Sequence, residues 1–192
     1  QIQDLTFNHI KNSIRLAHNL GSKYYSFHAG FLIDPDVNEL GKKITNRKLN
    51  SRKDCLEIFI SNVLKLSVYA QKYNVELLIE NNVLSYNNLN EFNDNPLLMV
   101  EKNECVEVMK STPNNVNLLV DFAHLKVSSN SLGFDAREFH EECREWIKAY
   151  HFSDNNGLSD SNSIFTEDAW FWPLLKKDLD YYSIEVYGVK YE

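Results

Sequence analysis

The sequence lacks the features that mark a membrane protein or a secreted, disulfide-bonded one. No apolar stretch approaches the roughly 20 residues that a transmembrane helix needs. The polar start Gln1-Ile2-Gln3-Asp4 has neither the basic nor the apolar region of a signal peptide. Cys55, Cys105 and Cys143 have no CxxC spacing, which favours buried, reduced thiols over a disulfide framework or a zinc knuckle. We therefore expect a soluble, cytoplasmic protein without membrane contacts.

The chain also lacks an excess of basic residues. Its 20 lysines and arginines are outnumbered by 27 aspartates and glutamates, and the net charge of −7 works against a large phosphate-binding surface. We therefore do not expect nucleic acid as a partner. One basic segment is present, and we interpret it as a solvated, mobile loop in preference to a phosphate or nucleic-acid contact. This segment contains Lys42, Lys43, Arg47, Lys48, Arg52 and Lys53.

Five short apolar runs are present, and segments with helical periodicity separate them. The runs have the length and composition of β-strands, and their alternation with helices predicts a parallel sheet of the α/β class. The carboxyl ends of parallel strands open on one side of such a sheet, so we expect a ligand site there. The predicted strands cover residues 24–28, 75–80, 116–121, 147–151 and 181–185.

Helices are predicted where apolar residues recur at steps of three and four. Gly21 follows the first helix as a C-terminal cap, and Pro96 opens the third. Two asparagine-rich stretches, residues 81–95 and 154–162, directly follow strand ends and are expected to form functional loops. The predicted helices cover residues 7–20, 56–67, 96–109, 139–147 and 170–179.

Each apolar run ends in a polar residue that can bind a metal ion or move a proton. Glu80, Asp121, His151 and Glu185 supply three carboxylates and one imidazole from four successive strands. This mixed oxygen and nitrogen set suits one divalent ion such as Mn²⁺, Mg²⁺, Co²⁺ or Zn²⁺. Three converging carboxylates also need a cation to offset their repulsion. One such residue alone commonly caps a turn, whereas four at one sheet edge favour a metal site.

Five strand-end motifs carry a family resemblance. They are Phe27-His28-Ala29-Gly30, Ile79-Glu80-Asn81-Asn82, Val120-Asp121-Phe122-Ala123-His124, His151-Phe152-Ser153-Asp154-Asn155 and Ile184-Glu185-Val186-Tyr187-Gly188. In order and spacing they resemble the motifs of the xylose isomerase-like TIM-barrel superfamily. That group includes sugar isomerases and epimerases, inosose dehydratases and the endonuclease IV family of DNA repair enzymes. The resemblance covers nearly the whole chain and implies a (β/α) TIM barrel.

The resemblance also implies a role for individual residues. The positions that match the four shared metal ligands are Glu80, Asp121, His151 and Glu185. In the isomerase and epimerase branch, the glutamates at positions 80 and 185 also exchange a proton with the substrate carbon. A metal that chelates a ketose stabilises the enediolate formed by this proton removal. The candidate substrate-binding residues are His28, His124, Asn82 and Asp154.

The sequence departs from the superfamily at three places after the strand that ends at His151. Endonuclease IV enzymes complete a three-zinc cluster with an Asp-x-His pair, but this chain has Asp160-Ser161-Asn162, so a trinuclear cluster is not expected. Many isomerase-like relatives carry a Gly-x-Gly turn before an Asp-Trp pair. The corresponding segment of this chain, residues 165–170, contains no glycine. Some ketose epimerases also have a basic residue where Asn155-Asn156-Gly157 stands.

The length of 192 residues predicts an incomplete barrel. A complete barrel of eight units takes about 250 residues, whereas this chain shows five to six of the eight units and opens with a helix. We expect residues 1–192 to form a single domain that lacks N-terminal and C-terminal units. Three explanations stay open, namely a fragment, a processed or degenerate relative, and a subunit completed by a partner. Open edges of a parallel sheet favour association with other strands, and a homo-oligomer is one assembly that would cover them.

The sequence therefore predicts a divalent-metal-dependent isomerase or epimerase that acts on a small sugar or polyol through an enediolate. Two alternatives stay open. The first is an endonuclease IV-like AP endonuclease, in which metals activate water to cleave a phosphodiester. The second is a non-catalytic remnant that binds a metal or a sugar, and the incomplete barrel is its main support.

Overall fold

A five-stranded, all-parallel sheet organises the chain, and the computed structural model describes residues 2–39 and 42–187 of it. All five predicted strands are confirmed, and their ends differ from the prediction by at most one residue. Gln1 and Gly188, which the predictions include, lie outside the described residues. The strands are β1 (Tyr24–His28), β2 (Glu76–Glu80), β3 (Val116–Asp121), β4 (Ile147–Phe152) and β5 (Tyr181–Ile184).

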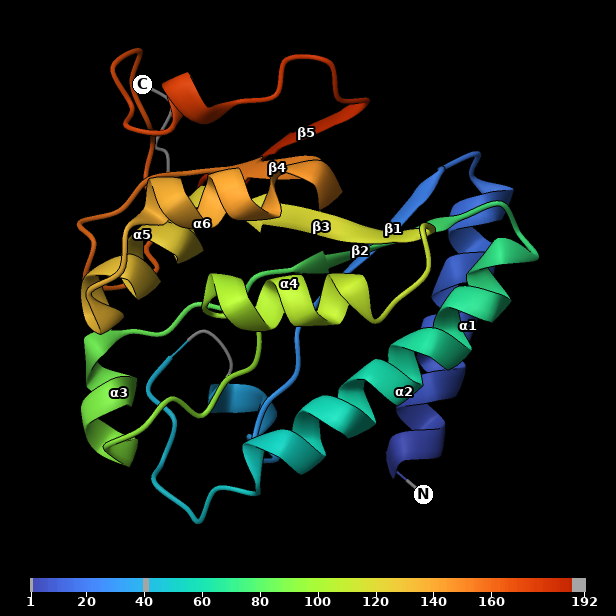
Figure 1. The fold of residues 1–192 in the computed structure, drawn as a ribbon, viewed down its shortest axis with the longest axis horizontal. Helices are drawn as coiled ribbons and strands as arrows, with labels where there is room; N and C mark the ends of the chain where they lie inside the picture. Colours follow the sequence, from blue (N-terminus) through green and yellow to red (C-terminus); the bar gives the residue numbers. More distant parts are fainter. Residues whose placement is uncertain (1, 40–41, 188–192) are drawn as a thin grey trace.

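Helices cover the outer side of this sheet, and Figure 1 shows α4 and α6 in front of the strands with α1 and α2 beside them. Each strand pairs in parallel with the next along the chain, so every connection crosses over to the neighbouring position. The result is an open half-barrel, as predicted. The helices are α1 (Ile2–Asn19), α2 (Arg52–Gln71), α3 (Tyr86–Phe92), α4 (Lys102–Lys110), α5 (Phe122–Leu132) and α6 (Ala136–Cys143).

The first two helices confirm the prediction from their apolar stripes. Gly21, with φ of 76°, follows α1 in the left-handed region that glycine adopts without steric cost. Ser51 caps α2 by accepting a hydrogen bond from the Asp54 amide. None of the helices in the described part of the chain combines the length and apolar character that a bilayer crossing requires.

The predicted third helix, residues 96–109, is wrong in its first half. Helix α4 begins only at Lys102, because the preceding amides find partners elsewhere. The Leu98 amide donates to the Gly30 carbonyl at 2.9 Å, and the Met99 amide donates to the Glu104 carboxylate. The apolar residues of this segment pack into the core as an irregular, bent connection in which Met99 has a φ of 55°, and periodicity alone does not distinguish such a segment from a helix.

The predicted helix over residues 170–179 is also wrong. A single 3₁₀ turn, η3 (Trp172–Leu174), is present there. The Lys176 amide donates to the Tyr150 hydroxyl at 3.2 Å instead of to a carbonyl one turn earlier. Tertiary contacts with β4 therefore replace the helical hydrogen bonds.

The sequence prediction missed two short helices, α3 and α5. Helix α3 lies in the asparagine-rich stretch predicted as a loop, and Ser85 caps it by accepting from the Asn88 amide at 3.3 Å. Most side chains of α5 are buried, and they include the consecutive residues Phe122–Leu125, which point about 100° apart around the helix axis. A helix buried on most faces has no polar stripe, so it gives no amphipathic signal. Two further 3₁₀ turns are η1 (Val37–Glu39) and η2 (Arg144–Trp146).

An aromatic cluster between α5 and β4 anchors the second half of the core. The Phe122 ring is fully buried and stacks on Tyr150 and Phe171, with centroid distances of 5.0 and 4.8 Å. Phe122 directly follows Asp121, so this packing also fixes the backbone that carries a candidate ligand.

We predict that Phe122→Ala lowers the free energy of unfolding by about 3–5 kcal/mol, because it removes a buried ring and leaves a cavity. Urea unfolding followed by circular dichroism measures this change. Leu158→Ala serves as the control, since Leu158 is exposed and its truncation should change the free energy by less than about 0.5 kcal/mol. Equal losses in both variants would contradict the central role of the aromatic cluster.

Candidate metal centre

Four predicted ligands meet at the carboxyl edge of the sheet. Glu80 and Asp121 end β2 and β3, His151 lies one residue before the end of β4, and Glu185 follows β5. One ligand atom from each residue lies within 4.8 Å of the others. The Nδ1 atom of His151 is 3.3 Å from Glu80 Oε1, 3.7 Å from Asp121 Oδ2 and 3.0 Å from Glu185 Oε2.

The atoms that face one another in this cluster lack hydrogen-bond partners. Glu80 Oε1, Asp121 Oδ2 and His151 Nδ1 are all buried, and none makes a hydrogen bond to a described residue. A buried polar atom without a partner costs free energy, so such atoms are rare unless a ligand satisfies them. The donor set therefore fits a divalent cation that accepts oxygen and nitrogen ligands.

Burial and the neighbouring charges shift the pKa values of residues in the cluster. Burial raises the pKa of Asp121 to about 6, although the nearby His124 opposes this shift. Burial tends to lower the pKa of His151, but contact with Glu80 and the charges of Asp121 and Glu185 outweigh it and raise that pKa. In its protonated form the His151 imidazole therefore offsets part of the negative charge of the three carboxylates.

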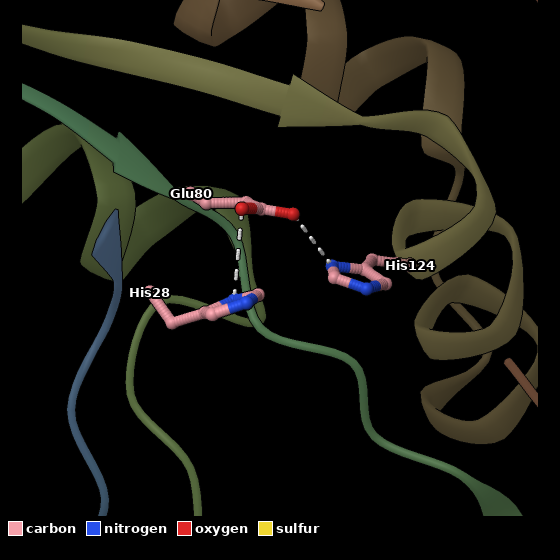
Figure 2. Close-up of side chains that lie close together, drawn as sticks. All are labelled: His28, Glu80 and His124. Atoms are coloured by element: carbon pink, nitrogen blue, oxygen red, sulfur yellow. Dashed lines mark ion pairs between the residues drawn. The ribbon is translucent and has the colours of Figure 1, made fainter. Parts of the chain in front are cut away.

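Glu80 also belongs to a second group of potential ligands. Figure 2 shows the Glu80 carboxylate between the rings of His28 and His124. Glu80 Oε2 is 3.7 Å from His28 Nδ1, and Glu80 Oε1 is 3.5 Å from His124 Nδ1. These three residues also offer ligand atoms within 4.8 Å of one another. The two predicted substrate-binding histidines therefore lie directly beside the four-residue cluster.

His124 is held on both ring nitrogens. Its Nδ1 lies 2.9 Å from the Asn81 carbonyl, which only accepts, so Nδ1 carries a hydrogen and donates it. Its Nε2 lies 3.3 Å from Asp160 Oδ2. The His124 backbone amide donates to Asp121 Oδ1 at 2.7 Å, which caps α5 and orients the aspartate.

Asp160 is a site residue that the sequence prediction did not include. Its Oδ1 atom is buried without a hydrogen-bond partner among the described residues, in the loop that joins Asp154 to Ser163. The sequence signal for it is its place in the Asp160-Ser161-Asn162 segment, at the position of the aspartate in the Asp-x-His pair of endonuclease IV enzymes. The folded loop brings this carboxylate to His124.

The same loop is tied to the end of β5. Asn162, with φ of 43°, accepts a hydrogen bond from the Tyr187 amide at 2.9 Å through its carbonyl. The Tyr187 hydroxyl in turn donates to Glu185 Oε1. This contact raises the pKa of Tyr187 to about 12 and fixes one oxygen of the glutamate.

A cavity of about 550 Å³ opens beside the cluster. Its apolar lining residues include Phe31, Ile44 and Leu97. Its polar lining residues include His28, Asn82, His124, Asp160, Glu185 and Tyr187.

The last two predicted substrate-binding residues have structural contacts. The Asn82 amide donates to the carbonyls of Gly30 and Leu98, both at 2.9 Å, while the residue also lines the cavity. Asp154 Oδ1 instead pairs with Lys126 Nζ at 2.6 Å and accepts from the Asn155 amide. Asp154 is not among the residues that line the cavity, so it has no proposed role in binding a substrate there.

Solved structures of sugar epimerases share this fold. A D-tagatose 3-epimerase-like protein is 19% identical with a TM-score of 0.70, and the match covers 96% of this chain and 63% of that one. D-psicose 3-epimerase from Clostridium cellulolyticum H10, solved with D-tagatose, is 12% identical with a TM-score of 0.64, covering 98% and 59%. The chain therefore spans about three fifths of the length of these structures.

A zinc-containing structure also shares the fold. The IOLI protein, solved with a bound zinc atom, is 15% identical with a TM-score of 0.63, and the match covers 93% of this chain and 59% of that one. No curated protein sequence matches the chain significantly. The family model described as xylose isomerase-like TIM barrel matches residues 1–187, and the chain therefore belongs to this family.

Proposed function

We propose that this chain forms the site of a divalent-metal-dependent isomerase or epimerase for small sugars or polyols. The observation that carries the proposal is the cluster of Glu80, Asp121, His151 and Glu185, with three buried ligand atoms left without partners. The sugar epimerases that share the fold support the substrate class.

The four clustered residues would hold one Mn²⁺, Mg²⁺, Co²⁺ or Zn²⁺ ion. When bound, the ion supplies Lewis-acid chemistry, because it polarises a substrate carbonyl and makes the adjacent C–H bond more acidic. Asp121 serves only to bind, since it is fully buried and the backbone amide of His124 holds its second oxygen. His151 completes the set with a neutral ring nitrogen.

Glu80 and Glu185 are the proposed acid and base. Burial opposes the ionisation of Glu80, but contact with His151 and the charges of His28 and His124 outweigh it and lower its pKa. Glu80 is therefore ready to accept a proton. Glu185 lines the cavity and follows β5, whereas Glu80 ends β2. The two carboxylates therefore approach a substrate in the cavity from different strands. One carboxylate removes the proton beside the carbonyl, and the other returns it.

His124 and His28 are the proposed substrate-orienting residues. Burial tends to lower the pKa of His124, but the carboxylates of Asp121, Asp160 and Glu80 outweigh it and raise that pKa to about 10. Both N–H groups of His124 are already engaged, by the Asn81 carbonyl and by Asp160, so its proposed role is its positive charge, which stabilises negative charge that develops on a nearby substrate oxygen. Its position beside Glu80 places this charge next to the proposed proton transfer.

One observation favours the endonuclease alternative. The second group, His28, Glu80 and His124, offers ligands for a further ion, and Asp160 adds a carboxylate beside His124. Two observations oppose it, namely the net charge of −7 and the asparagine at position 162 where a third zinc would need histidine. The number of bound metal ions separates these possibilities and also tests the non-catalytic alternative.

We predict about one Mn, Co, Mg or Zn ion per chain in protein purified without chelators or a histidine tag, and its loss in Asp121→Ala. Elemental mass spectrometry measures the content. Asp154→Asn is the matched control, because Asp154 also follows a strand but pairs with Lys126, so this variant should retain the ion. About three zinc ions would instead support the endonuclease, and none in the wild-type protein would support the remnant.

We predict that Glu185→Gln slows hydrogen exchange at the substrate carbon by about 10²- to 10⁴-fold, since the amide cannot accept the proton. Proton NMR of D-tagatose, D-psicose and D-fructose in D₂O follows the exchange. Glu167 is exposed and lies between β4 and β5, so the control variant Glu167→Gln should exchange the substrate hydrogen at the wild-type rate. Undiminished exchange in Glu185→Gln, with metal retained, would remove Glu185 from the catalytic pair.

We predict that His124 stabilises the metal-free fold most at low pH. The folded pKa of about 10 exceeds the unfolded value of about 6.5, so its contribution is complete below pH 6.5 or so and disappears as the pH rises through about 10. Urea unfolding with chelator at several pH values should show the difference between wild type and His124→Gln shrinking with rising pH. His9→Gln, at an exposed position of α1, should show no such trend.

A further inference from the structure

Two basic residues also line the cavity. Lys42 and Lys43 line the same cavity of about 550 Å³ as His124, Asp160 and Glu185. We propose that these lysines bind a terminal anion, so that the substrate is a sugar or polyol carrying a phosphate or a carboxylate group. This inference rests on the proposed function, because it places the reacting carbons at the metal centre and the anion at the lysines.

The loop that carries the lysines is fixed to the body of the protein. Asn88 of α3 is buried and spans the loop, since its amide donates to the Lys42 carbonyl at 3.1 Å and its oxygen accepts from the Ile44 amide at 3.0 Å. A buried side chain that satisfies two backbone groups holds a segment without regular secondary structure. The backbone of the lysine pair therefore has a defined position at the cavity wall.

Further contacts extend this anchoring along the loop. The Arg47 guanidinium forms an ion pair with Glu39 at 2.6 Å and donates to the Asp34 carbonyl at 2.8 Å. The Asn46 side chain donates to the Glu91 carbonyl at 2.6 Å. The interpretation of this basic segment as a solvated, mobile loop does not account for these contacts. Within the segment, Arg47 has a structural role, whereas the two lysines face the cavity.

The two lysines differ in how their charge is balanced. Lys43 Nζ pairs with Glu91 at 2.7 Å, which neutralises and positions it. No carboxylate of the described residues forms an ion pair with Lys42, whose charge is therefore available to a ligand. An ammonium group binds phosphate or carboxylate as a point charge with several hydrogen-bond donors. Lys42 is thus the principal anion-binding residue of the proposal.

Acidic residues in the same cavity restrict where such an anion can bind. Asp160 and Glu185 also line the cavity, and Glu185 belongs to the cluster with Glu80 and Asp121. These carboxylates repel a free anion, while they suit hydroxyl groups and a metal ion. A substrate with hydroxyls and one terminal anion is therefore expected to bind with its anion at the lysines and its hydroxyls at the acidic residues.

The volume of the cavity suits a ligand of the proposed kind. Ligand-binding cavities have volumes of about 300–1,000 Å³, and this cavity has about 550 Å³. Apolar residues Phe31, Ile44 and Leu97 also line it. Lys42 itself is exposed, so solvent partly screens its attraction to an anion.

The test compares ligands that differ only in the anion. Isothermal titration calorimetry on the metal-loaded chain uses D-fructose, D-fructose 6-phosphate and the corresponding uronate. We expect an anionic ligand to bind about tenfold more tightly than D-fructose, which is the gain typical of a charge-assisted hydrogen bond. Of the two anionic ligands, the one with the higher affinity shows whether the site recognises phosphate or carboxylate. Equal affinities of all three, or no binding by any of them, would overturn the proposal.

A matched pair of variants assigns the effect to Lys42. Lys42→Ala should reduce the advantage of the anionic ligand to about threefold or less, with D-fructose affinity unchanged. Lys48→Ala removes the same charge from the same loop but outside the cavity lining, and it should leave the advantage intact. Thermal melting of both variants checks that they fold. An unchanged preference in Lys42→Ala would refute the assignment.

Inorganic phosphate separates this proposal from the proposed function. If Lys42-dependent phosphate binding, followed by ³¹P NMR, persists while the chain binds no metal and exchanges no substrate hydrogen, the isomerase is rejected and the anion site stands. If metal binding and exchange are present without any preference for anionic ligands, the anion site is rejected and the isomerase stands.

Discussion

The convergence of carboxylates at one sheet edge is the constraint on which the rest of the structure depends. Glu80, Asp121 and Glu185 place their negative charges in a space that is largely screened from water, where repulsion is strong. His151 lies within 3.0 to 3.7 Å of all three and offsets part of this repulsion. Without the packing of these strands the charged groups would move apart. The favourable free energy of core packing therefore offsets the repulsion between the carboxylates.

The register of the sheet provides the rigidity that this arrangement needs. His28 pairs directly with Glu80 across β1 and β2, and Asp121 pairs with His151 across β3 and β4. Neighbouring strands lie about 4.8 Å apart, so paired residues present their side chains to the same small volume. Asn81 adds a cross-link, because its side chain both donates to and accepts from the backbone of Asp121. Backbone hydrogen bonds thus set the spacing of the cluster before any ligand binds.

The sequence predicted the parts that depend on local pattern. Buried parallel strands are continuous apolar runs, so their ends, and with them the four clustered residues, were placed correctly at one edge. Helix α5 was missed because burial on most faces removes the polar stripe, and residues 96–100 were misread because a buried, irregular segment has an apolar content similar to that of a helix. Asp160 and Lys42 reach the cavity through loops, and no local pattern encodes where a loop side chain ends in space.

The link between the Asn162 carbonyl and the Tyr187 amide joins the loop that carries Asp160 to the residue that holds Glu185. In folds of this kind, new substrate preferences commonly arise through changes in loop length and composition. Here an insertion or deletion between Asp154 and Ser163 would displace Glu185, the residue proposed for proton transfer, as well as the cavity wall. A change in this loop would therefore alter the shape of the cavity and the position of Glu185 together.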